Sequence, residues 1–338
     1  MKSKKKTPEF IGNYASISQE FIAYKRSIGF KYEAEEKIMS RFSKFSKDSP
    51  LDVIILEKSL VEAFITTKPN EQPKTRQLRI SVIRQFAYYL ISLGYDAYVV
   101  PPQRRVNTTT FVPYIFTHNE ITKIFKTADA IRKNSSSPYI HKILPVLIRV
   151  LYGTGLRISE ALKLRVQDVY LEDGYFMIRE AKFDKERLIP MSESLLATCK
   201  TYKNTMELMD DDYFFPSIDY SQLSPNTIYN RFRKILWDSH IPYGGKGSGP
   251  RLHDLRHTCA VHALNNWVQD EKDVYSLLPV LSKFLGHESI RSTERYLRLT
   301  AEIYPDIIQK TSDICGYVIP MYTQPESLAE TGDIHAAN

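Results

Sequence analysis

The sequence predicts a mainly α protein with a small β-hairpin or sheet (α+β), divided into two domains. Three observations predict this class. Apolar residues recur every three or four positions over long stretches, which is typical of amphipathic helices. Two short segments, 175–179 and 187–190, alternate as strands do and flank a turn. A proline- and threonine-rich stretch, 99–110, has no apolar period and separates the helical segments into two groups.

The composition excludes several classes of protein. The 338 residues suit two domains, at roughly 150 residues per domain. A hydrophobic fraction of 43% with 12% aromatic residues is enough for packed cores. No run approaches the ~18 apolar residues of a membrane span, and Met1–Lys6 has no apolar segment behind it as a secretory signal would. Three widely spaced cysteines argue against a disulfide scaffold or zinc ribbon and favour a reducing cytoplasm.

The net charge of +7 is unevenly spread along the chain. Residues 1–107 carry a net +8, residues 108–296 a net +3 and residues 297–338 a net −4. A basic N-terminal third favours a polyanionic partner, most simply nucleic acid. A small, well-solvated domain is the alternative interpretation of the same charges.

Four helices are expected in the first domain. Ser16 and Gln19 form a capping signal for the first helix, and the second spans about 34–45. The third spans about 56–66, after the break at Pro50. The fourth, 75–93, has the clearest pattern, and Gly94 follows it as a C-terminal glycine. Its expected apolar stripe consists of Leu78, Val82, Phe86, Tyr89 and Leu93.

Three arginines of the fourth helix fall mostly off this stripe: Arg76, Arg79 and Arg84. They form either a solvated face or a face that contacts DNA phosphates. The stretch 99–110, which includes Arg104 and Arg105, is expected to be an interdomain linker. Thr117 and Glu120 then form a capping box that begins a helix of the second domain.

The second domain is expected to be mostly helical with one β insertion. An apolar helix over 144–152 ends at Gly153 and Gly155, and the hairpin places Ala181–Lys185 at its tip. The glycine-rich segment 244–249 lacks the preceding strand and the Lys-Ser/Thr ending of a phosphate-binding loop, so we interpret it as a connector. Further helices are expected at 225–237, 253–267 and 277–285.

Six side chains form the candidate chemistry of this domain: Arg157, Lys182, His253, Arg256, His287 and Tyr296. Two arginines that converge on one point can hold a phosphate. A histidine and a lysine can transfer protons, and a tyrosine can act as an oxygen nucleophile. The histidines and cysteines lack the spacing of a metal site, and Asp210–Asp212 has the composition of a solvated turn.

Four segments resemble, in the right order, the signature boxes of the tyrosine recombinases, the phage integrase family. Thr154–Leu162 is similar to the first box, and Ala181–Pro190 to the lysine-bearing β-turn, although it lacks that turn's common glycines. Leu252–Thr258 is similar to the His-x-x-Arg box, and Leu285–Tyr296 to the last box, with nine residues from His287 to Tyr296. Together the boxes cover about residues 111–310.

The resemblance implies a role for each candidate residue. Arg157 and Arg256 would hold the non-bridging oxygens of the scissile phosphate. Tyr296 would attack it, giving a 3′-phosphotyrosyl bond and a free 5′-hydroxyl. Lys182, with Lys185 as its rival, would protonate the leaving oxygen.

The remaining implied roles concern the histidines and one carboxylate. His253 would assist proton transfer at the tyrosine, His287 would hydrogen-bond the phosphate, and Glu160 would support the site. His257 is expected to be structural. Because the covalent intermediate conserves the bond energy, no cofactor is implied, neither ATP nor metal.

The resemblance also implies a division of labour along the chain. Residues 1–106 would form a helical, SAM-like core-site DNA-binding domain, with Arg76, Arg79, Arg84, Arg104 and Arg105 as candidate contacts. Residues 107–116 would be a linker and 117–312 the catalytic domain. The tail, 313–338, would dock on a neighbouring subunit, and packing in cis is its alternative.

We therefore expect a cytoplasmic site-specific DNA recombinase or integrase, most simply one encoded by a mobile element. A phage, an integrative element, a transposon and a role in resolving chromosome dimers are all open as its setting. It would act on double-stranded DNA as a homotetramer on paired sites, and off DNA it would be a monomer or weak oligomer. Accessory directionality factors would be further partners, and no membrane association is expected. The alternatives are a type IB topoisomerase, which would relax supercoils without a paired site, and a DNA-binding regulator that has lost catalysis. Six intact catalytic-type positions count against the regulator.

Overall fold

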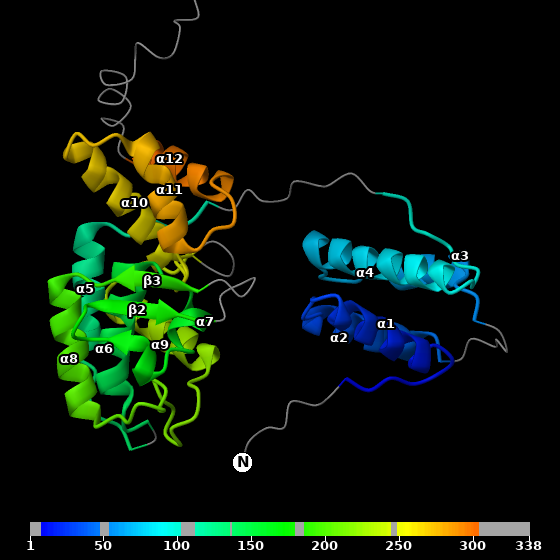
Figure 1. Cartoon of the computed structure of the whole chain (residues 1–338), viewed down its shortest axis with the longest axis horizontal. Helices are drawn as coiled ribbons and strands as arrows, with labels where there is room; N and C mark the ends of the chain where they lie inside the picture. The colour runs from blue at the N-terminus through cyan, green and yellow to red at the C-terminus, as the bar shows by residue number, and fades with distance from the viewer. Residues whose placement is uncertain are drawn as a thin grey trace, which may run out of the picture. The chain divides into compact units, whose positions relative to one another are not determined.

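The computed structural model describes residues 8–47, 54–102, 112–135, 137–179, 186–244 and 249–303. The chain divides into two compact units between Phe111 and Val112 (Figure 1). The described residues are mostly helical and contain one small antiparallel sheet, which confirms the predicted fold class. None of the described helices is long and apolar enough to cross a membrane.

The first unit is built from four helices around one aromatic core. They are α1 Ala15–Ser27, α2 Glu33–Phe45, α3 Lys58–Ile65 and α4 Pro73–Ser92. Phe21, Phe42 and Phe86 are fully buried where α1, α2 and α4 meet, with rings edge-on or tilted at 5.3–5.9 Å. The predicted N-terminal cap of α1 is wrong: Tyr14 precedes the helix, and the Ser16 hydroxyl donates to Glu20 instead.

The apolar face of α4 is rotated from the predicted stripe. Val82 and Phe86 of the predicted stripe are buried, but Leu78 and Leu93 are exposed. Ile80, Ile83 and Leu90, outside the stripe, are buried. Arg79 therefore lies on the buried side of the helix, and its guanidinium forms an ion pair with Glu71 at 2.6 Å. The two side chains are only 6% and 10% exposed, so the predicted contact between Arg79 and DNA is wrong.

The other two arginines of α4 tie the helix to neighbouring loops. Arg76 donates to the carbonyl of Ile65, and Arg84 donates to the carbonyls of Val100 and Pro101. A guanidinium carries five N–H groups. Arg76 and Arg84 therefore have N–H groups that these bonds to carbonyls do not use. Arg104 and Arg105 lie outside the described residues.

The second unit consists of eight α-helices, a short 3₁₀ helix η1 and three strands within the described ranges. In chain order they are α5 His118–Asp129, α6 Ile140–Thr154, α7 Ile158–Ala161, η1 Val166–Asp168, β1 Val169–Tyr170, β2 Tyr175–Ile178, β3 Arg187–Pro190, α8 Glu193–Met206, α9 Pro225–Asp238, α10 Asp254–Gln269, α11 Val274–Leu285 and α12 Arg291–Ile303.

The predicted hairpin and capping box are both present. β2 and β3 pair antiparallel with Phe176 opposite Ile189, and Thr117 and Glu120 cap α5 reciprocally. The elements that were not predicted include η1, β1, α8 and α12. β1 adds a third strand in the order β1-β2-β3, and α8 begins where the Ser192 hydroxyl accepts from the Leu195 amide.

Helix α6 lies at the centre of the second unit. Ten of its fifteen residues are buried, and it packs against α5, α8 and α10. A separate apolar cluster joins α10, α11 and α12 and includes Leu264, Leu281, Leu285 and Tyr296. Because α11 also contacts β3, the C-terminal helices lie next to the sheet (Figure 1).

Candidate active site

The first arginine of the site follows a sharp turn at the end of α6. Gly155 adopts the left-handed conformation, φ +59°, that ends the helix. A Cβ there would come within 2.7 Å of the Leu285 side chain, so glycine permits both the turn and the close packing of α11. Two residues later Arg157 opens α7, and its side chain, 32% exposed, donates to Glu160 at 2.8 Å and to the Gly286 carbonyl at 3.2 Å.

Arg256 joins the C-terminal ends of two helices. It lies in the first turn of α10 and donates to the carbonyls of Gly155, at 2.8 Å, and Leu285, at 2.6 Å. These carbonyls belong to the ends of α6 and α11, where the helix dipole is negative and favours a cation. Arg256 is 2% exposed. Burial, aided by the positive charge of Arg157, lowers its pKa to about 10, and it stays charged at neutral pH.

Glu160 is shared by two guanidinium groups. It accepts from Arg157 and also from Arg187 of β3, at 3.2 and 2.9 Å. Arg187 also donates to the Phe284 carbonyl. Burial alone would raise the pKa of Glu160, but the hydrogen bonds and charges of Arg187 and Arg157 outweigh burial and lower it. Glu160 therefore stays ionised and holds α7 against the sheet.

Tyr296 is buried against α10. The side chain is 2% exposed, and its hydroxyl hydrogen-bonds Nδ1 of His257 at 2.9 Å. Burial raises the pKa of the phenol, while the nearby Arg256 and Arg295 oppose that rise. The phenol is therefore protonated at neutral pH.

Two further predicted histidines lie in the same region. Nδ1 of His287, two residues after α11, is 2.8 Å from the Thr293 hydroxyl, and its ring is stacked on that of Tyr296 at 6.0 Å. Burial and the charges of Arg256 and Arg157 lower the pKa of His287 to about 4, so its ring is neutral near pH 7. The exposed His253 precedes α10, with its ring edge-on to His257 at 4.9 Å.

The structure thus brings together five of the six predicted catalytic residues, with Glu160: Arg157, His253, Arg256, His287 and Tyr296. Lys182 and its rival Lys185 lie outside the described residues, as does the predicted tail. In the described part of the chain, no group of three or more His, Cys, Asp or Glu side chains is placed to hold a metal ion.

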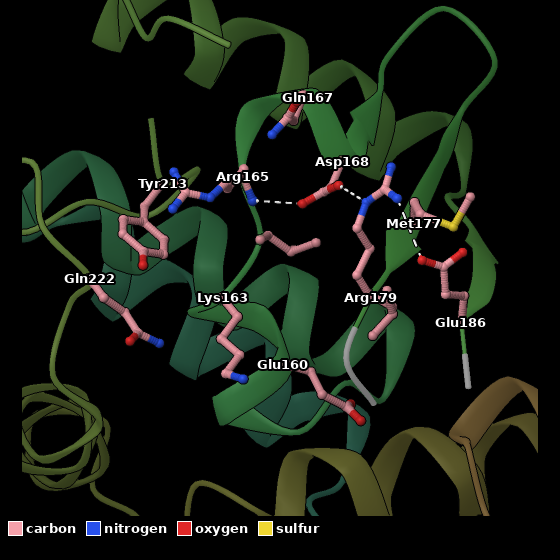
Figure 2. A pocket seen from close by; sticks show the side chains of 12 residues that line it. Glu160, Lys163, Arg165, Gln167, Asp168, Met177, Arg179, Glu186, Tyr213 and Gln222 are labelled. Carbon is pink, nitrogen blue, oxygen red and sulfur yellow. Dashed lines mark hydrogen bonds and ion pairs between the residues drawn. The ribbon is translucent and has the colours of Figure 1, made fainter. Parts of the chain in front are cut away.

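Glu160 also lines a groove of about 560 Å³. Figure 2 shows Lys163, Arg165 and Arg179 around it, with Asp168 between the two arginines. Asp168 accepts from the Arg165 amide at 3.2 Å and from Arg179 at 2.6 Å. Cations and carboxylates are interleaved in its lining, which does not include Tyr296. The groove is therefore not where Tyr296 and the arginines meet.

Two residues of the site were not identified from the sequence. Arg187 lies two residues before Ile189 in β3, so it shares a face of the strand with this fully buried residue. A charged residue on the buried face of a strand is a signal that could have found it. His257, expected to be structural, contacts the hydroxyl of Tyr296; its position one residue after Arg256 did not reveal this contact.

Comparisons with known proteins agree with the fold and the site. The model of the phage integrase family matches residues 115–302, more than half of the chain. A Sinorhizobium fredii protein named as an integrase/recombinase, y4rB, is 27% identical over 89% of this chain and 97% of its own length. Tyrosine recombinase XerD of Rhizobium meliloti is 28% identical over 68% of this chain and 72% of its own length. The chain therefore belongs to the phage integrase family, the tyrosine recombinases.

Two solved structures share the fold. The XerH site-specific recombinase, bound to its palindromic difH substrate in a post-cleavage complex, matches with a TM-score of 0.61 at 20% identity. The match covers 90% of this chain and 86% of that one. The Tn1549 transposon integrase, in complex with transposon right end DNA, matches with a TM-score of 0.59 at 15% identity, over 86% of this chain and 99% of that one.

Proposed function

We propose that this chain is a site-specific DNA recombinase that cleaves and rejoins DNA through a 3′-phosphotyrosyl intermediate on Tyr296. The observation that carries the proposal is the convergence of Arg157, Arg256 and His287 around a buried tyrosine. The phage integrase family and its recombinase members support the reaction class.

In the proposed reaction, Arg157 and Arg256 hold the non-bridging oxygens of one phosphate. Tyr296 attacks the phosphorus, and the bond to the 5′-oxygen breaks. The negative charge that develops is stabilised by cations already fixed by backbone carbonyls and Glu160, so little reorganisation is needed during the reaction. Lys182 protonates the leaving oxygen, and His287 hydrogen-bonds the phosphate.

The other parts of the chain receive proposed roles from their charge and sequence. Residues 1–106, the basic unit, grip DNA, with Arg76, Arg84, Arg104 and Arg105 as candidate contacts, and residues 107–116 link it to the catalytic domain, 117–312. The tail, 313–338, docks on a neighbouring subunit. The enzyme works in the cytoplasm as a homotetramer on paired sites and is a monomer or weak oligomer off DNA. Accessory directionality factors are further proposed partners. In support, recombinase relatives were solved on DNA as a dimer and as a tetramer.

A covalent trapping assay tests the proposed function. The probe is a nicked duplex that carries the inverted repeat nearest to the gene, and the readout is a protein–DNA adduct that survives SDS. We expect the adduct with the wild type and none with Tyr296→Phe. An adduct that persists in Tyr296→Phe contradicts the assignment of the nucleophile.

The arginine variants separate catalysis from folding. Arg157→Ala and Arg256→Ala should each abolish the adduct and keep DNA affinity in a gel shift. Loss of affinity to the same degree would mean that these arginines maintain the fold rather than hold the phosphate. A supercoil-relaxation assay beside a two-site recombination assay distinguishes a recombinase from a topoisomerase.

A further inference from the structure

The hydroxyl of Tyr296 already has a hydrogen-bond partner that can take its proton. Nδ1 of His257 lies 2.9 Å from the hydroxyl oxygen, and the two side chains are 7% and 2% exposed. Arg256 also hydrogen-bonds Tyr296, but a guanidinium can only donate. Between these two neighbours, the phenolic proton can be accepted only by His257.

The surroundings of His257 keep its ring neutral, with a free lone pair, and also make it a weaker base than an exposed histidine. Burial lowers the pKa of His257 to about 3, and the positive charges of Arg295, Arg256 and Arg251 and the ring of His253 add to the effect. The ring is therefore neutral at physiological pH. A bound phosphate brings negative charge next to Arg256 and offsets part of that repulsion, which raises the proton affinity of His257 as the phenol begins to attack.

His253 is less well placed for the same task. It stands one helical turn before His257 at the N-terminus of α10 and is exposed. Its ring contacts the ring of His257 edge-on at 4.9 Å. His253 is therefore positioned to act on His257 or on the DNA, while His257 holds the reacting oxygen itself.

We propose that His257 is a catalytic residue, the general base that accepts the phenolic proton of Tyr296 as the tyrosine attacks DNA and returns it when the strand is rejoined. The proposal rests on the proposed function. In the forward step the Tyr296 oxygen forms its bond to phosphorus, the phosphorus–O5′ bond breaks, and the phenolic proton moves to Nδ1 of His257. The leaving O5′ takes its proton from Lys182. The reverse step restores both protons.

The test compares His257→Asn with a matched variant on the same helix. Asparagine can place a hydrogen-bond acceptor near the position of Nδ1 but is not a base. His262, also on α10, hydrogen-bonds the hydroxyl of Tyr152 through Nδ1 at 2.8 Å and is 4% exposed. His262→Asn therefore removes the same kind of buried histidine–tyrosine contact away from the nucleophile. Both variants are checked for the wild-type melting temperature and DNA affinity.

Two nicked duplexes with the inverted repeat nearest to the gene separate the base from the acid. One carries the ordinary 5′-bridging oxygen at the scissile phosphate, and the other carries sulfur, which leaves as a thiolate without a proton donor. Single-turnover adduct formation is measured on both. His257→Asn should be slower by roughly 10²–10⁴-fold on both substrates, and His262→Asn should match the wild type. Lys182→Ala should be slow on the oxygen substrate and recover on the sulfur substrate.

Each result decides the proposal. If Tyr296 leaves His257 before it attacks, His257→Asn cleaves as fast as the wild type or faster, which overturns the proposal. Recovery of His257→Asn on the sulfur substrate also overturns it, because that pattern belongs to an acid at the leaving group. An equal loss in His262→Asn shows a folding effect and overturns it as well. If the wild type forms no adduct on either duplex, the proposed function itself fails.

Discussion

Replacing Glu160 by glutamine should destabilise the catalytic unit, because it removes the one carboxylate that two guanidinium groups share. Glu160→Gln keeps the shape of the side chain but places an amide N–H group against N–H donors. The pair with Arg187 is buried, with side chains 9% and 12% exposed. Removing one partner of a buried ion pair costs about 3–5 kcal/mol. The pair with Arg157, whose side chain is 32% exposed, adds no more than about 1 kcal/mol.

Urea unfolding of the full chain, followed by tryptophan fluorescence, measures the free energy of unfolding of the second unit, which contains Glu160. Both tryptophans, Trp237 and Trp267, belong to the second unit. The matched control is Asp129→Asn, which breaks a bidentate pair with Arg149 at 2.7 Å. Those side chains are 51% and 25% exposed, so the free energy of unfolding should fall by less than about 1 kcal/mol. Equal losses in the two variants would refute the reasoning.

Three further predictions concern single side chains. Arg79→Met leaves the buried Glu71 unpaired, so it should lower the free energy of unfolding of the first unit by about 3 kcal/mol, measured by circular dichroism in urea. It should change DNA affinity less than twofold in a gel shift, whereas weaker binding at unchanged stability would restore Arg79 as a DNA contact. Gly286→Ala forces a Cβ to within 2.7 Å of the Arg187 guanidinium at φ +67° and should cost more than about 1 kcal/mol; an unchanged melting temperature would contradict this. His257 has a pKa below its unfolded value, so the unfolded chain binds the proton first as the pH falls. The wild type should lose about 2 kcal/mol more than His257→Asn between pH 7.5 and pH 5, and equal losses in urea titrations at the two pH values would contradict the shift.

Local patterns in the sequence were sufficient to predict most of the helices and strands. The capping box of Thr117 and Glu120 is confirmed because it depends on residues three apart. The hairpin of β2 and β3 is confirmed because alternation specifies both strands and their pairing face. The apolar stripe of α4 was misplaced because a sequence pattern assigns every arginine to the polar face, even one that is buried. The ion pair with Glu71 that allows Arg79 to be buried depends on the fold of the loop before the helix.

The site divides in the same way. The motif positions of Arg157 and Arg256 could be identified from the sequence, but the groups that hold them could not. Gly155, Leu285 and Gly286 hold the two guanidinium groups through backbone carbonyls, which leave no signature in side-chain types. The contacts of Arg187 with Glu160 and of His257 with Tyr296 join residues 27 and 39 positions apart. Only the packing of β3 and α12 against the site creates them.

The two arginines are held in place by different means, and the difference has a consequence for catalysis. Arg256 is fixed by the carbonyl ends of α6 and α11, so its position depends on the packing of the helices. Arg157 is held by the Gly286 carbonyl and by a single carboxylate, Glu160, that it shares with Arg187. Loss of Glu160 should therefore loosen Arg157 and leave Arg256 in place. Two cations held close together repel each other, and this repulsion contributes to the lowered pKa of Arg256. An anionic phosphate held between the two guanidinium groups, as proposed above, would relieve part of that repulsion.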